Sequence, residues 1–315
     1  MSEHARLLKQ VRQALLQEDY ASALEALSIL AKQAREAEDH GAMARHHGNL
    51  ALVYHRLGQP DAALEHFSLA LASARTIGDP TMQSGILGNA GNVLREMGRT
   101  EDAIAYLENA LALAVDAGDE RGRGIWFSNL ALIYDDVGEF SYSIPLHEQS
   151  IIVARKLRDL RGLAARLGNL ARSYVGRGDH PSALLHLQEA VMLDRDLDDK
   201  PWLAQHLATI GNLYVTLAER TSTRVGMQYC FERALDHLRQ SLGVAHEIGD
   251  ALMQADLLRI MGIIYYQSGD YDQAINHLDT AYQMFKGLNY ESPLVELERA
   301  VAQAQAARQL QATGA

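Results

Sequence analysis

Apolar and polar positions alternate along this chain with a helical period, and the whole pattern recurs at multiples of 40 residues. The segment 48–58, GNLALVYHRLG, returns as SNLALIYDDVG at 128–138 and as GNLARSYVGRG at 168–178. In each copy a leucine and a tyrosine stand four residues apart, which places them on one face of a helix. Self-similarity at a fixed period predicts a tandem array of amphipathic helices.

Aspartate and glycine mark where the predicted helices begin and end. An aspartate before an apolar-periodic run caps a helix, because its carboxylate accepts free amide protons of the first turn. A glycine in mid-repeat suits the left-handed residue that ends a helix. Each repeat therefore contains a helix A, which starts after the aspartate, and a helix B, which starts shortly after the glycine. The aspartates are Asp39, Asp79, Asp119, Asp159, Asp199 and Asp250, and the mid-repeat positions are Gly58, Gly98, Gly138, Gly178, Ala218 and Gly269.

Small residues occupy a fixed place beside the leucine–tyrosine face. A small side chain at this place lets helix A approach helix B closely. The positions are Ala51, Gly91, Ala131, Ala171, Gly211 and Gly262.

The order of these marks resembles the tetratricopeptide repeat. One repeat shows it with Leu50, Ala51, Tyr54, Gly58, Ala63, Phe67 and Ala70. The usual repeat has 34 residues, and a 40-residue period resembles the long-helix subclass of Pins/LGN-type adaptors and bacterial peptide-sensing regulators. The resemblance implies an all-α fold, a right-handed α-solenoid of about seven helix pairs with a C-terminal capping helix.

The repeat marks also set the expected boundaries. Because each helix pair needs its neighbours to bury its apolar face, we expect one continuous superhelix over 1–315. The repeats run over about 1–39, 40–79, 80–119, 120–159, 160–199, 200–249 and 250–289, and the capping helix over 291–312.

Two repeats depart from the pattern. The sixth carries an 11-residue insertion near 218–231, since Ala183 and Ala234 are 51 residues apart and not 40. Its segment 219–229 predicts a mobile loop followed by an extended helix B. In the fourth repeat Pro145 lies inside helix B, where a proline removes a backbone hydrogen bond and favours a kink.

Charge and composition narrow the classes of partner and compartment. The formal net charge of −11 disfavours nucleic acid and anionic membranes as partners. Cys230 is the only cysteine, so neither an intrachain disulfide nor a cysteine-based zinc site is expected. The charged start MSEHARLLKQ lacks the apolar core of a secretory signal, so we expect a cytoplasmic protein.

A row of asparagines is the main candidate for binding. Asn is a mediocre helix former, yet it holds the same helix A position in four successive repeats. Its carboxamide offers a donor and an acceptor, as an extended peptide backbone does. By resemblance, helix A lines a concave groove, and related arrays hold peptides with groove asparagines. The predicted peptide-binding residues are Asn49, Asn89, Asn92, Asn129, Asn169, Asn212, Arg45, Arg56, Arg95 and Arg172.

Each feature of this site has a structural alternative. The asparagines could instead cap or bridge helices as residues inherited by duplication. The small residues before them, Gly48, Gly88, Ser128 and Gly168, leave room either for a ligand's main chain or for close packing between repeats. Asp135 and Asp136 form an acidic patch among the arginines, a mixture that orients a ligand more than it adds affinity.

No motif points to catalysis, a metal or a cofactor. The segment DRDLDD at 194–199 opens like a calcium loop but has Asp199 where glycine is required and Gln205 at the twelfth place. Nucleophile-elbow and phosphate-loop motifs are absent from the sequence. We therefore expect a non-catalytic adaptor without cofactors that binds a peptide segment of a partner protein. The alternatives are a regulatory sensor of a short signalling peptide and a self-assembling, homo-oligomeric scaffold.

Overall fold

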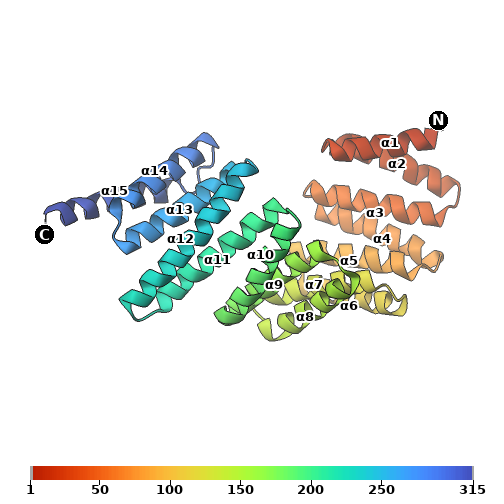
Figure 1. The fold of residues 1–315 in the computed structure, drawn as a ribbon. Coiled ribbons are helices and arrows are strands. Elements are labelled where there is room, and N and C mark those ends of the chain that lie inside the picture. The colour runs from red at the N-terminus through yellow and green to blue at the C-terminus, as the bar shows by residue number, and fades with distance from the viewer. Residues whose placement is uncertain (1–2, 314–315) are drawn as a thin grey trace. The chain divides into compact units, whose positions relative to one another are not determined.

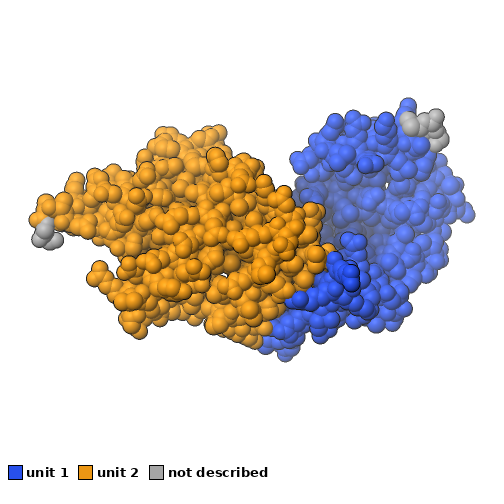
Figure 2. Space-filling view, viewed as in Figure 1, with its two compact units in different colours: residues 1–158 blue, residues 159–315 orange. Residues whose placement is uncertain are grey.

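The computed structural model describes residues 3–313, which form helices joined by short connections (Figure 1). The chain divides into two compact units, unit 1 over residues 1–158 and unit 2 over residues 159–315 (Figure 2). In each unit, helices that follow one another in sequence pack side by side as hairpins. No helix within 3–313 has both the length and the apolar character needed to cross a membrane.

Unit 1 contains four helix pairs. Helices A and B of each pair contact one another, and each B helix contacts the next A helix. The elements are α1 (Glu3–Leu16), α2 (Tyr20–Glu36), α3 (His40–Arg56), α4 (Pro60–Thr76), α5 (Pro80–Glu96), α6 (Thr100–Asp116), α7 (Glu120–Asp136) and α8 (Phe140–Leu157).

Unit 2 contains three helix pairs and a final helix. The elements are α9 (Leu160–Arg177), α10 (His180–Asp196), α11 (Lys200–Arg220), α12 (Arg224–Glu247), α13 (Ala251–Ser268), α14 (Tyr271–Gly287) and α15 (Leu294–Thr313). The predicted fold class is confirmed: the described chain is all-α, with seven helix pairs followed by a capping helix. That these form one continuous superhelix stays a prediction.

The aspartate caps stand where the sequence predicts them, with one exception. Five of the six carboxylates accept a hydrogen bond from the amide three residues ahead, as Asp39 does from Ala42 at 2.8 Å. Asp199 occupies the same position but accepts no capping bond. Its carboxylate instead lies 3.5 Å from Arg161 Nε, within unit 2.

The mid-repeat glycines have the left-handed backbone that was predicted for them. Their φ angles lie between 69° and 87° at Gly58, Gly98, Gly138, Gly178 and Gly269. Side chains other than glycine rarely adopt this conformation, so the turns between helices A and B depend on these positions.

The small residues of helix A do admit the facing helix B. A Cβ atom added at Gly91 would lie 2.9 Å from Leu107 Cγ, and one added at Gly211 would lie 2.6 Å from Leu238 Cγ. Gly262 stands equally close to Leu278. These leucines are almost completely buried, so each hairpin forms its core through this contact.

The insertion in the sixth repeat lengthens two helices and adds little loop. α11 continues through Ala218 to Arg220, and α12 begins at Arg224. The loop predicted at the start of 219–229 is therefore shorter than expected, because within this segment only 221–223 lies outside a helix. Thr223 explains the early start of α12, because its side chain accepts the amide hydrogen of Gly226. The extended helix B was predicted correctly.

α15 acts as the predicted cap of unit 2. It packs on α14 and α13 and buries Leu297 against a cluster that includes Leu278 and Phe285. In unit 1, α8 runs unbroken through Pro145.

Candidate functional site

The asparagine row of unit 1 lies on the A helices of three successive pairs. Asn49 on α3 is exposed, while Asn89 on α5 and Asn129 on α7 are half-buried. Within residues 3–313, none of these three carboxamides makes a hydrogen bond to the protein. Their donors and acceptors are therefore open to a ligand or to water, and they do not bridge helices.

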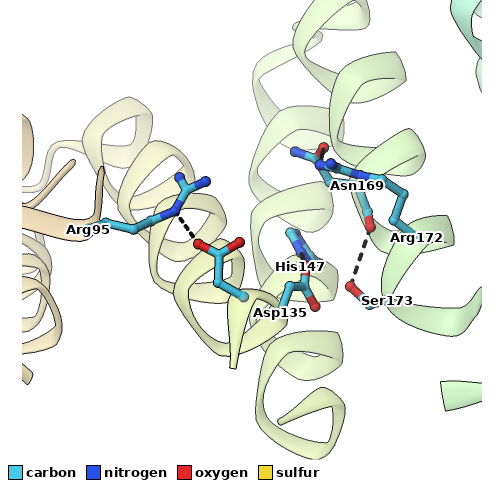
Figure 3. A network of polar contacts seen from close by, with 7 residues as sticks. Arg95, Asp135, His147, Asn169, Arg172 and Ser173 are labelled. Atoms are coloured by element: carbon cyan, nitrogen blue, oxygen red, sulfur yellow. Dashed lines mark hydrogen bonds and ion pairs between the residues drawn. The ribbon is translucent and has the colours of Figure 1, made fainter. Parts of the chain in front are cut away.

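The asparagine of unit 2 is held differently. Asn169 Oδ1 accepts a hydrogen bond of 2.6 Å from Arg172 Nη2, so two predicted binding residues meet on α9 (Figure 3). Ser173 Oγ donates to the backbone carbonyl of Asn169 at 3.3 Å. The two remaining candidates lie one turn further along their helices, with Asn212 exposed on α11 and Asn92 half-buried on α5.

The predicted arginines of unit 1 fall into two groups. Arg45 and Arg56 are exposed on α3. Arg95 Nε on α5 donates to Asp136 Oδ2 on α7 at 2.6 Å (Figure 3). Asp135, the other half of the predicted acidic patch, bonds to the buried His147 at 2.9 Å. Both carboxylates of the patch thus have partners within unit 1, which reduces the charge they offer to a ligand.

The small residues before the asparagines separate into two kinds. A Cβ atom at Gly88 would overlap the ring of Trp126, and one at Gly168 would overlap the imidazole of His206. Close packing between successive A helices therefore explains these two glycines. A Cβ atom at Gly48 would meet nothing within 4 Å, so Gly48 is the one of these three glycines with open space beside it.

Unit 2 contains a cavity of about 490 Å³ that sequence reasoning missed. It includes the predicted pair Asn169 and Arg172, and most of its other residues are apolar or aromatic. The lining consists of Gly168, Asn169, Arg172, Leu187, Pro201, Trp202, Gln205, His206, Thr209, Ile248, Asp250 and Met253.

One side of this cavity is formed by Trp202 and His206, and a buried carboxylate positions the histidine. His206 Nδ1 lies 2.6 Å from Asp194 Oδ2, and both side chains are buried, with 3% and 1% of their surface exposed. The ring of Trp202 stacks on His206 at a centroid distance of 5.4 Å. α10 thus orients a histidine of α11, which in turn supports the half-exposed tryptophan.

Comparison with protein families identifies the repeat. Two family models, both described as tetratricopeptide repeat, match residues 83–151 with 228–287 and residues 8–80, together more than half of the chain. The chain belongs to the tetratricopeptide repeat family. A model described as anaphase-promoting complex subunit 5 matches residues 165–216. No curated protein matches the sequence.

Solved structures support the same fold. The tetratricopeptide repeat sensor protein of Pyrococcus horikoshii, a signal transduction ATPase with numerous domains, aligns with a TM-score of 0.74 at 13% identity. That alignment covers 98% of this chain but 45% of the other. RapI in its apo form aligns with a TM-score of 0.63 at 14% identity, covering 96% and 100%. A Rap protein complexed with competence and sporulation factor aligns with a TM-score of 0.57 at 13% identity, and the alignment covers 96% of this chain and 98% of that protein. At these identities the likeness shows the fold alone.

Four tetratricopeptide hairpins contain a second repeated contact, a tyrosine of helix A beside a histidine of helix B. The ring centroids are between 4.9 and 5.9 Å apart. The pairs are Tyr54–His66 in unit 1, and Tyr174–His186, Tyr214–His237 and Tyr265–His277 in unit 2. The sequence contains a signal for these pairs, because their histidines recur at the spacing of the repeat.

Burial makes some of these histidines poor bases. It lowers the pKa of His237, an effect that Arg233 and Arg195 strengthen and Asp236 opposes. Both ring nitrogens of His237 are buried without a hydrogen-bond partner in the described structure. Burial also lowers the pKa of His66 and of His47, whose Nδ1 atoms lie 3.0 Å apart. The fold therefore favours the neutral imidazole at these positions.

We expect the melting temperature to fall as the pH drops from about 7.5 to about 5.5. A pKa that is lower in the folded state means that the unfolded chain binds more protons below its own pKa of about 6.5. The stability is thus complete above that pKa and is lost as the pH decreases. His237→Phe should flatten the slope, because phenylalanine preserves the ring contact with Tyr214 and does not titrate. An equal slope in wild type and variant would contradict this assignment.

Among residues 3–313 there is no group of three or more His, Cys, Asp or Glu side chains placed to hold a metal ion.

Proposed function

We propose that this tetratricopeptide array is a non-catalytic adaptor that binds an extended peptide segment of a partner protein along the faces of its A helices. The observation that carries the proposal is the row of Asn49, Asn89 and Asn129 in unit 1. The three carboxamides share one register on α3, α5 and α7, and none makes a hydrogen bond to another group within residues 3–313. Such a row can hold a peptide main chain without reading its side chains.

Two further facts support a protein or peptide partner. A Rap protein of similar fold is known in complex with competence and sporulation factor, and another relative by fold carries a tetratricopeptide repeat sensor. The net charge of −11 disfavours nucleic acid and anionic membranes as ligands. Exposed arginines such as Arg45 and Arg56 provide local positive charge on α3, which would orient an acidic peptide.

Asn129→Ala tests this proposal once a partner has been captured and its binding segment synthesised. Affinity for the peptide should fall by about 1–3 kcal/mol, the cost of leaving a buried polar group of the ligand unpaired. The free protein should keep its stability, because alanine is the better helix former and the carboxamide has no hydrogen-bond partner among the described residues. Calorimetric titration and thermal unfolding on the same variant measure the two effects.

Asn109 offers a matched control in the same unit. It lies on the B helix α6, where its carboxamide donates to the carbonyl of Ala105 at 2.9 Å. Asn109→Ala should leave the affinity unchanged. If Asn129→Ala lowers stability and leaves the affinity per folded molecule intact, the asparagines are structural and the peptide proposal fails.

A further inference from the structure

We propose that the cavity of unit 2 binds an organic carboxylate attached to a large apolar group. The sources of such a ligand are a free organic acid or the C-terminal residue of a peptide chain. All residues that line the cavity belong to unit 2. The inference therefore does not depend on the asparagine row of unit 1, and failure of the Asn129→Ala test would leave it standing.

Arg172 supplies the recognition of charge. Its guanidinium is the only Lys or Arg group in the lining of the cavity, and no carboxylate within residues 3–313 pairs with it. Its one hydrogen bond in the described part of the chain is to Asn169 Oδ1, a neutral acceptor that orients the group without cancelling its charge. The guanidinium of Arg172 therefore has N–H donors left for a ligand. Its planar, forked arrangement of donors matches the two oxygens of a carboxylate.

The cavity also contains one carboxylate, that of Asp250. Its Oδ1 already accepts the amide hydrogen of Met253 at 2.9 Å, as the cap of α13. The partial positive charge at the start of that helix offsets the charge of Asp250. The charge of Arg172 therefore outweighs the offset charge of Asp250, and the cavity favours an anionic ligand over an amine.

Apolar recognition comes from Trp202 and its neighbours. The indole is 46% exposed, yet the buried His206–Asp194 pair holds it in place. Gly168 is required for this arrangement, since any side chain there would displace His206. Further apolar surface is provided by Leu187, Pro201, Ile248 and Met253. A rigid aromatic surface of this kind loses little conformational entropy when a ligand stacks on it.

The size of the cavity fits a small ligand. Its volume of about 490 Å³ falls within the range of roughly 300–1,000 Å³ that small-molecule sites occupy. An apolar cavity with a few convergent polar groups is the usual form of such sites. Here the polar side chains are those of Asn169, Arg172, Gln205, Thr209 and Asp250, together with the imidazole of His206.

The direct experiment titrates the full chain with 3-phenylpropionate and, as its matched cation, 3-phenylpropylamine. A ligand of this size should bind with a Kd of about 1 mM or tighter if it fills the site. We expect the acid to bind and to quench the fluorescence of Trp202, and the amine to bind at least about tenfold more weakly. Saturation-transfer NMR and calorimetry give the affinities.

Two arginine variants separate the cavity from a general charge effect. Arg172→Gln should weaken 3-phenylpropionate by about tenfold, the loss of one charge-assisted contact. Arg299→Gln removes an exposed arginine from α15 in the same unit and should change nothing. Trp202→Ala should also abolish the acid's binding, and circular dichroism verifies that each variant is folded.

A peptide that ends in phenylalanine identifies the source of the ligand. If its free carboxylate form binds more tightly than 3-phenylpropionate while its C-terminal amide does not, the site recognises the C-terminal residue of a peptide chain. If only the free acid binds, the site is for small molecules. The proposal is overturned if the amine binds as well as the acid, if the two arginine variants behave alike, or if the acid fails to bind at about 5 mM.

Discussion

Gly88→Ala should destabilise unit 1 by about 2–4 kcal/mol, although alanine is the better helix former. The added methyl group would overlap the indole of Trp126, which is 7% exposed and lies across the backbone of α5. Trp126 cannot move freely, because its Nε1 donates to Ser84 Oγ at 2.8 Å, and that hydroxyl donates to the carbonyl of Ala110 at 2.7 Å. Displacing the ring would break this buried chain of hydrogen bonds, which is costly in a tightly packed core.

Gly48→Ala is the matched control for Gly88→Ala. Gly48 holds the same place in the preceding repeat, but an added Cβ atom there would meet nothing within 4 Å. This variant should be up to about 1 kcal/mol more stable than wild type, through helix propensity alone. Urea unfolding of both variants gives the difference. Equal changes in the two would show that the glycines of this column do not serve packing between A helices.

The regular part of the fold was readable because its signals are local. An aspartate cap acts on an amide three residues ahead, and a glycine turn depends on its own φ angle. Asp39 and Gly58 therefore fulfil the same roles in the structure that the sequence predicts for them. Repetition strengthened these signals, since the same marks recur at a constant spacing.

The loop predicted from the polar start of 219–229 is longer than the one in the structure, where only 221–223 lies outside a helix. Helix formation there depends on tertiary packing, which composition does not report. Ala218 continues α11 as a buried residue, and Cys230 and Phe231 are buried on α12. Only Thr223, a good cap in front of the second helix, gave a local signal of where α12 begins.

The cavity of unit 2 was not predicted because it depends on contacts between successive repeats. Trp202 and His206 have no counterpart of the same type in the neighbouring repeats, so the periodic pattern hides them. Asp194 is the one residue of this cluster with a signal in the repeat pattern. It stands at the place of Ala34, Ala74, Ala114 and Ala154, each of which is buried. A carboxylate in a column of buried alanines indicates a specific partner, and that partner is His206.

Asp194→Ala should destabilise unit 2 by about 3–5 kcal/mol, the usual result of removing one member of a buried hydrogen-bonded pair. The carboxylate is 1% exposed and lies 2.6 Å from His206 Nδ1, so its loss leaves a buried imidazole nitrogen without a partner. Asp194→Asn keeps an acceptor oxygen at the same place and should lose markedly less stability than Asp194→Ala.

A double-mutant cycle isolates the contact between Asp194 and His206. The variants Asp194→Ala, His206→Ala and their combination should show a coupling energy of about 1–3 kcal/mol in urea unfolding. Because Trp202 rests on His206, Asp194→Ala should also weaken the binding of 3-phenylpropionate although Arg172 is unchanged. Additive effects in the cycle would mean that Asp194 acts independently of His206. The tryptophan would then be held by packing alone, and the cavity would keep its affinity in the variant.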